Sequence, residues 1–187
     1  AGAKTAAATD VIAELVAEPE GEEHLQRQSI AIAAYVAAPT DALVASLVRV
    51  SHDDASLLRR ASIVTLGSTV RHMLEGGRDG GPGLLANYIG YASAYFDVMD
   101  AYVPAASPAD GTFTVAPDAT GLPDLPLAGA GRLESLEWLR GLGATRSAEV
   151  LPLLKRAMRS NDELVRGTAV YALADIRTVE TAHLVRN

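Results

Sequence analysis

The sequence lacks several residue types and patterns that would identify a class of protein. None of its 187 residues is cysteine, which excludes a disulfide framework, a thiolate zinc site and a thiol nucleophile. No run of about 18 apolar residues occurs, so no transmembrane helix is expected. Aromatic residues make up only 5% of the chain. Small aliphatic side chains must therefore do most of the packing in the core.

Positive charge is also scarce. The chain has 16 Lys and Arg residues against 23 Asp and Glu residues, a net charge of −7. A nucleic-acid backbone needs a basic stripe on its protein partner, so we expect no nucleic-acid partner. The hydrophobic fraction of 49% is that of a globular protein, and the length suffices for one core or for several helical repeats.

Catalytic motifs are missing as well. None of the four histidines belongs to an H-E-x-x-H motif, and no G-x-S-x-G elbow occurs. The glycine-rich stretch 75–83 (EGGRDGGPG) lacks the G-K-[ST] ending of a phosphate-binding loop. His72 and Glu75 stand at i and i+3, but two ligands are too few for a metal site. We therefore predict no enzyme activity, no catalytic residue, no metal and no cofactor.

The clearest local pattern is the helix predicted by residues 160–176 (SNDELVRGTAVYALADI). Ser160 and Glu163 have capping-box spacing at its start, and Asp162 is a second candidate cap. Apolar residues then recur at helical spacing and share one face: Val165, Ala169, Ala172, Leu173 and Ile176. Because much of this face is alanine, a neighbouring helix can come close.

A second apolar stripe precedes this helix and comprises Val150, Leu151, Leu154, Ala157 and Met158. The intervening turn, residues 159–162, is so short that it predicts an antiparallel hairpin. Other helices are predicted over residues 5–17, 22–37, 41–50, 55–74, 84–102 and 132–142. Thr40 is a candidate N-cap, residues 75–83 form a glycine-rich break, and Gly143 is a predicted C-terminal stop.

Residues 41–70 repeat the pattern of the C-terminal hairpin. Leu58-Arg59 matches Val165-Arg166 at a shift of 166 − 59 = 107 residues. The same shift carries Leu43 onto Val150, Leu47 onto Leu154 and Leu66 onto Leu173. This distance corresponds to about three repeats of a helical array, whose periods are usually about 20–50 residues.

A turn Asp followed by Val-Arg, an alanine and Ala-Leu resembles a HEAT or HEAT-like repeat. The resemblance is best over residues 147–178 and fair over 40–72. It implies an all-α, right-handed solenoid of antiparallel helical hairpins, in which Arg59 and Arg166 each pair with a turn Asp. We expect residues 1–187 to be one such domain, cut from a longer protein.

Two segments are also similar to the helical domain of the vitellogenin and microsomal lipid-transfer family. They are LLRRASIVTLGSTVRHM at 57–73 and LEWLRGLGATRSAEVLPLLKRAM at 136–158. In that family, a similar helix containing Leu-Gly-Ser precedes a Leu-Gly helix and a helical hairpin. This resemblance implies lipid transport as the activity.

Two further stretches interrupt the regular pattern. The helix predicted at 84–102 carries four of the six tyrosines. Tyr88 and Tyr95 are candidates for an apolar groove, and ordinary packing is the alternative. Residues 103–131 contain five prolines and predict a Pro/Gly-rich insertion between repeats, either lying across the concave face or mobile.

These patterns favour a non-catalytic scaffold that binds another protein. In this hypothesis, the second helix of each hairpin presents the partner surface, with Arg59, Ser62, Thr168 and Tyr171 as candidate contacts. Two alternatives remain open. One is the helical domain of a lipid-transport protein, for which lipid is the ligand and the tyrosine helix, with Tyr88 and Tyr95, and the leucines of the insertion frame the opening. The other is a lyase subunit with HEAT-like repeats, which resembles the phycobilin lyases and needs a chromophore groove that only the tyrosine helix could supply.

Overall fold

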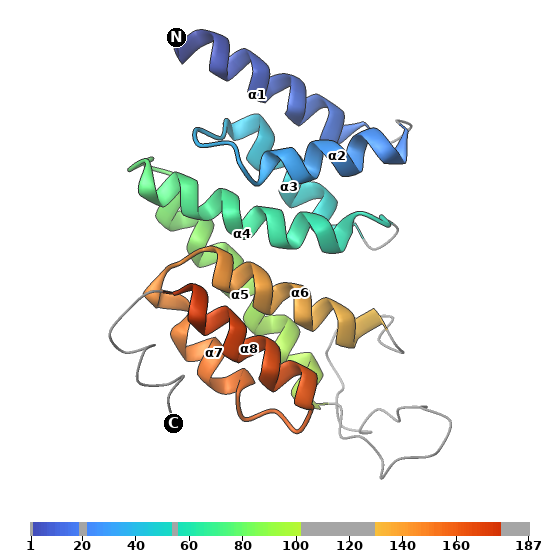
Figure 1. Cartoon of the computed structure of the whole chain (residues 1–187), viewed down its shortest axis with the longest axis vertical. Coiled ribbons are helices and arrows are strands. Elements are labelled where there is room, and N and C mark those ends of the chain that lie inside the picture. Colours follow the sequence, from blue (N-terminus) through green and yellow to red (C-terminus); the bar gives the residue numbers. More distant parts are fainter. Residues whose placement is uncertain (1, 19–21, 54–55, 102–129, 177–187) are drawn as a thin grey trace.

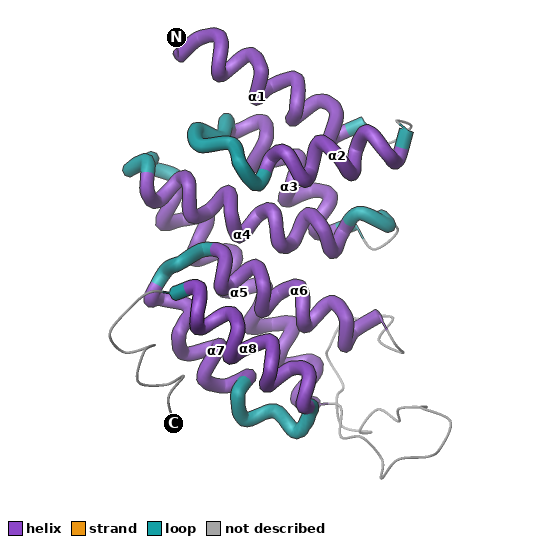
Figure 2. The backbone as a smooth tube through the Cα atoms, in the orientation of Figure 1, coloured by secondary structure: helices purple, strands orange, loops and turns teal. Residues whose placement is uncertain are grey.

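The computed structural model describes residues 2–18, 22–53, 56–101 and 130–176, and these residues form helices and loops without a strand (Figures 1 and 2). The prediction of an all-α fold is therefore confirmed for this part of the chain. The helices are α1 (Gly2–Ala17), α2 (Glu23–Ala33), α3 (Asp41–His52), α4 (Arg59–Glu75), α5 (Gly81–Ala101), α6 (Ala130–Ala144), a 3₁₀-helix (Ala148–Val150), α7 (Leu151–Ala157) and α8 (Glu163–Asp175).

The even-numbered helices form one layer. Helices α2, α4, α6 and α8 follow one another down this layer in Figure 1, and each contacts the next. Helices α3 and α5 lie behind the layer, and each packs against α4. All four helices of the layer begin at the same edge, on the right of Figure 1. Helices that are neighbours in this layer are thus separated in sequence by one helix of the other layer.

Three apolar pairs matched by the shift of 107 lie in the core. Leu43, Leu47 and Leu66 are buried, and so are their counterparts Val150, Leu154 and Leu173. The two copies are the pairs α3–α4 and α7–α8, and among the described residues α5 and α6 lie between them. The spacing of about three repeats stays a prediction, because residues 102–129 between α5 and α6 lie outside the described residues.

Side-chain caps define two helix starts. Thr40 Oγ1 accepts a hydrogen bond from the Leu43 amide at 3.4 Å, which confirms the predicted cap of α3. At α8, Asp162 Oδ1 accepts from the Leu164 and Val165 amides at 2.8 and 3.4 Å. The predicted capping box of Ser160 is wrong, because Ser160 lies two residues before the N-cap Asp162, and its Oγ accepts a hydrogen bond from the Asp162 amide at 3.2 Å.

Two glycine predictions need correction. Gly143 does not stop α6, which continues to Ala144. A Cβ on Gly143 would lie 2.8 Å from Ala172 Cα, so this glycine allows α8 to pack closely on α6. The predicted break at 75–83 is shorter in the structure, because α4 extends to Glu75 and α5 already begins at Gly81. The tight turn between them contains Gly77 with a φ of 61°, a conformation that suits glycine.

The predicted insertion at 103–131 falls almost entirely outside the described residues. Its last two residues, Ala130 and Gly131, belong to α6. The predictions for that segment therefore stay predictions.

Candidate functional site

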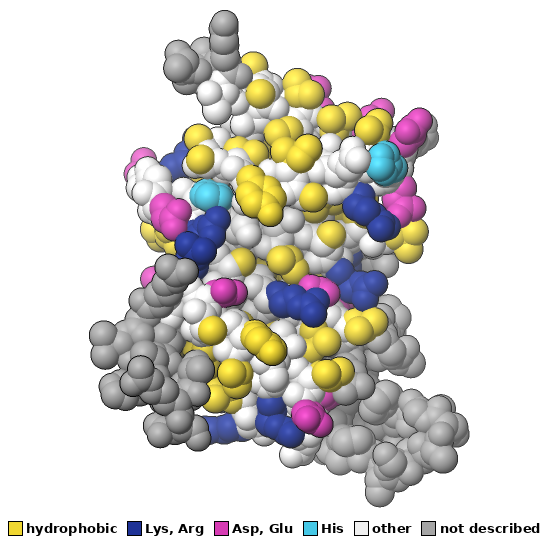
Figure 3. All heavy atoms as spheres, in the orientation of Figure 1, with side chains coloured by type: hydrophobic (Ala, Val, Ile, Leu, Met, Phe, Trp, Pro, Cys, Tyr) yellow, Lys and Arg dark blue, Asp and Glu magenta, His cyan; other side chains and the backbone are white. Residues whose placement is uncertain are grey.

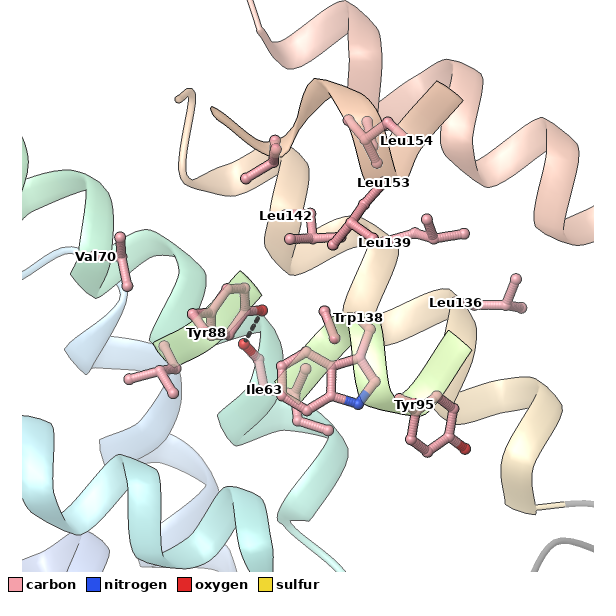
Figure 4. Close-up of a cluster of buried hydrophobic side chains, with 14 of the residues drawn as sticks. Ile63, Val70, Tyr88, Tyr95, Leu136, Trp138, Leu139, Leu142, Leu153 and Leu154 are labelled. Carbon is pink, nitrogen blue, oxygen red and sulfur yellow. Dashed lines mark hydrogen bonds between the residues drawn. The ribbon is translucent and has the colours of Figure 1, made fainter. Parts of the chain in front are cut away.

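The two tyrosines predicted to frame an apolar groove lie inside the protein. Tyr88 and Tyr95 have exposed fractions of only 1% and 8%, and they pack against Trp138 of α6 with ring centroids 5.1 and 6.5 Å away (Figure 4). The Tyr88 hydroxyl donates a hydrogen bond to the Ile63 carbonyl of α4 at 2.8 Å. Both side chains fill the core instead of lining an opening, which corrects the expectation of a groove at this place.

The buried hydrogen bond of Tyr88 can be tested by removing one oxygen. Burial raises the pKa of the Tyr88 hydroxyl far above its ordinary value, so it stays a protonated donor at physiological pH. We expect Tyr88→Phe to lower the free energy of unfolding by about 1 kcal/mol, measured by urea denaturation. Tyr91→Phe is the matched control, because Tyr91 is on the same helix and is exposed. Equal effects of the two changes would contradict the proposed role of this hydrogen bond.

Arg59 joins α4 to α6 through a carboxylate. Arg59 Nη2 lies 2.7 Å from Glu134 Oε1, and the two side chains are only 18% and 9% exposed. Burial raises the pKa of Glu134, and the guanidinium of Arg59 partly offsets this rise. The predicted pairing of Arg59 with an Asp of the turn before it stays a prediction, because part of that turn lies outside the described residues. Arg59 thus forms an ion pair between stacked helices and offers little side-chain surface to a partner.

Ser62 and Arg166 also differ from the sequence-based expectation. Ser62 is fully buried on α4, so it cannot belong to an exposed partner surface. Arg166 Nη1 donates to the carbonyls of Ser160 and Asn161, both at 2.9 Å. The predicted Arg–Asp pair at Arg166 is therefore wrong, because the side chain holds the turn through its backbone carbonyls.

Thr168 and Tyr171, the other two predicted contact residues, line an open groove between α6 and α8. The groove has a volume of about 440 Å³. Its lining residues are Arg140, Glu163, Leu164, Gly167, Thr168, Tyr171, Ala172 and Asp175. Tyr171 is 79% exposed and Leu164 is 53% exposed, so the groove offers apolar surface to solvent. This groove is the candidate functional site.

The groove also has a distinct charge pattern. Glu163 and Asp175 stand at the two ends of α8, and neither has an ion-pair partner in the described part of the chain. Arg140 of α6 is already paired, with its Nη1 2.7 Å from Glu137 Oε1. Among the described residues the groove therefore presents two carboxylates without an ion-pair partner, which suit a cationic ligand better than an anionic one.

Exposed leucines mark the edge at which the helices of this layer begin. Leu25, Leu57, Leu133 and Leu164 each lie within three residues of the start of α2, α4, α6 or α8, and all are exposed. Hydrophobic and charged side chains occur together along this edge in Figure 3. The sequence analysis did not identify these exposed leucines, although the repeat pattern contains them. The shift of 107 places Leu57 on Leu164, and neither leucine is at a position of the predicted apolar face.

Metal sites and membrane-spanning helices are two further kinds of functional feature. In the described ranges, no three His, Asp or Glu side chains come close enough together to hold a metal ion. His72 Nδ1 lies 3.8 Å from Glu75 Oε2, and its other ring nitrogen is 3.3 Å from the Ala34 carbonyl. Among the described helices, none has both the length and the apolar character needed to cross a bilayer.

Comparison with known proteins adds no assignment to this geometry. No protein-family model matches the chain, and no curated protein is significantly similar to it in sequence. The HEAT-like and vitellogenin-like resemblances therefore stay predictions.

Proposed function

We propose that this chain is a non-catalytic protein-binding module, built as a right-handed solenoid of HEAT-like helical hairpins. The layer of α2, α4, α6 and α8 is its binding face, and the groove between α6 and α8 is the main contact point. The observation that carries the proposal is the open groove itself, which is bordered by the exposed side chains of Leu164 and Tyr171.

The arrangement of the helices supports this proposal. Each even-numbered helix packs on the next one, as expected when helical repeats stack to bury a continuous core and to offer an extended surface. Tyrosine is enriched among the residues that dominate protein interfaces, because its ring is large and carries a polar end. Tyr171 has both properties and is available for contact.

The two alternatives have less support from the geometry. The lipid hypothesis placed its opening at Tyr88 and Tyr95, which instead fill the core against Trp138. The lyase hypothesis needs a chromophore groove, for which the same tyrosine helix was the candidate. A protein partner at the α6–α8 groove requires neither feature.

Peptide selection tests the proposal. A random peptide library is displayed and selected on the purified domain, and the affinities of the enriched ligands are then measured. We expect Tyr171→Ala to weaken these ligands at least about tenfold, because it removes the largest exposed apolar side chain of the groove. Tyr35→Ala is the control, because Tyr35 is also a highly exposed tyrosine but follows α2 at the other end of the layer.

Two results would contradict the proposal. One is that selection yields no ligand at all, and the other is that the ligands respond equally to both substitutions. A fluorescent fatty-acyl probe is offered in parallel. Saturable binding of this probe that Tyr171→Ala abolishes would favour lipid as the occupant over protein.

A further inference from the structure

Gly167 in α8 has no packing role within the part of the chain that the structure describes. Glycine inside a helix is destabilising relative to alanine, so its presence there usually has a structural reason. For Gly67, Gly141 and Gly143 the reason is plain, because a Cβ on any of them would overlap a neighbouring helix. A Cβ on Gly167 would meet no atom within 4 Å. The glycine leaves the backbone of α8 open to approach from outside.

The side chains around Gly167 match the contact surface of a helix. Leu164 lies three residues before it and Tyr171 four residues after it, so one apolar side chain stands about one turn away on either side. Between them Gly167 contributes only backbone to the lining of the groove. A small residue at the crossing point with larger residues beside it allows two helices to approach closely.

An extended peptide is a poorer fit to this site. Such a peptide usually binds by adding a strand to a sheet edge, which satisfies its backbone amides and carbonyls. The described residues contain no strand, and the groove is lined by side chains of two helices. A helical ligand satisfies its own backbone hydrogen bonds and needs only apolar and charged contacts.

The acidic residues of the groove indicate which side chains lie beside the apolar face of a helical ligand. Glu163 and Asp175 are 12 residues apart, which is about 18 Å along α8. Asp175 lies in the last turn, where a negative charge is unfavourable next to the helix dipole, and the described residues supply no cation to it. Basic residues near both ends of the docked helix would neutralise the two carboxylates.

We infer that the occupant of the α6–α8 groove is a basic amphipathic helix of a partner protein, which packs along α8 with its closest approach at Gly167. This inference rests on the proposed function and specifies its ligand. The apolar stripe of the ligand contacts Leu164 and Tyr171, and its Lys or Arg residues face Glu163 and Asp175.

Selection from three libraries of equal size tests this inference. The first encodes amphipathic helices with an apolar stripe and basic flanks, the second has the same stripe with acidic flanks, and the third encodes proline-containing extended peptides. We expect the first library to yield the tightest ligands, at least about tenfold tighter than those of the other two. Their affinity should fall as salt concentration rises, because the charge contacts are exposed.

Gly167→Leu is the decisive variant. The leucine side chain would occupy the floor of the groove without touching the rest of the chain, so the domain should keep its unfolding temperature and lose at least about tenfold in affinity. Gly90→Leu is the matched control, because a Cβ at Gly90 of α5 also meets nothing within 4 Å and Gly90 does not line the groove. It should leave the affinity unchanged.

The remaining outcomes separate this inference from the proposed function. Ligands that come only from the acidic or extended libraries, and that still depend on Tyr171, would overturn the basic helix and keep the binding module. Ligands unaffected by Gly167→Leu would overturn the crossing point. No ligand from any library would overturn both proposals. Self-association that Gly167→Leu abolishes would identify a second copy as the occupant and also overturn the inference.

Discussion

Gly67→Ala should lower the free energy of unfolding by about 3 kcal/mol or more, although it adds a single methyl group. Gly67 lies where α4 crosses α6, and the added Cβ would lie 2.7 Å from the carbonyl carbon of Gly141 and 2.9 Å from its Cα. These atoms are backbone and cannot rotate away as a side chain can. The two helices must move apart, which disturbs a close-packed core. The loss of stability should therefore equal or exceed the largest values typical of substitutions that overpack a core.

The crossing involves a third helix, which raises the expected cost. A Cβ on Gly141 would overlap the Tyr88 hydroxyl and lie 3.1 Å from the Ile63 carbonyl that this hydroxyl contacts. The backbone of Gly141 therefore lies close both to α4 and to Tyr88 of α5. Moving α6 away from α4 to make room for a methyl group on Gly67 would also disturb the packing of Tyr88 and its hydrogen bond to Ile63.

Gly90→Ala is the matched control for Gly67→Ala. A Cβ at Gly90 meets nothing within 4 Å, so the change should stabilise α5 by about 0.5–1 kcal/mol. Urea denaturation of the two variants beside the wild type measures both effects. If Gly67→Ala lowers the free energy of unfolding no more than Gly90→Ala does, the proposed close crossing of α4 and α6 at Gly67 is contradicted.

Helical periodicity predicted the fold class and much of the core because it is a local property. The three pairs Leu43–Val150, Leu47–Leu154 and Leu66–Leu173, matched at a shift of 107, are buried, and Thr40 and Asp162 cap the helices that they precede. The prediction that Gly143 ends its helix is wrong because a local pattern does not show which helix packs against the glycine. A glycine at a helix end and a glycine at a helix crossing look alike in sequence, and only the approach of Ala172 distinguishes them.

The candidate site was predicted only in part. Thr168 and Tyr171 do line the groove, whereas Ser62 is buried. The burial of Ser62 could have been predicted, because the shift of 107 places it on Ala169, a residue of the apolar face. The contribution of Arg140 could not, since it depends on how closely α6 packs on α8. The same holds for Glu134, which is 134 − 59 = 75 residues from Arg59 in sequence.

Arg59→Met should destabilise the fold by about 3–5 kcal/mol near neutral pH. Methionine keeps much of the apolar stem of arginine but removes the guanidinium, which leaves the Glu134 carboxylate buried between α4 and α6 without this counter-charge. Removing one member of a buried ion pair is costly for this reason, whereas replacing both members is often tolerated. The double variant Arg59→Met/Glu134→Gln should therefore recover a large part of the loss.

The pH dependence of this variant identifies the carboxylate as the cause. Burial raises the pKa of Glu134 above its ordinary value, and Arg59 opposes that rise, so the pKa should be higher still in Arg59→Met. A raised pKa means that the folded state binds the proton more tightly than the unfolded chain does. The stability of the variant relative to wild type should then increase as the pH falls from about 7 towards about 5. The same gain is lost when the pH is raised through the folded-state pKa of Glu134.

Urea denaturation at several pH values, for wild type and for the single and double variants, measures this difference. The double variant is the control, because it has no carboxylate at position 134 and should show no such gain on acidification. A loss in Arg59→Met that stays constant between about pH 5 and pH 7 would show that packing of the arginine stem, and not the charge of Glu134, determines the stability of this contact.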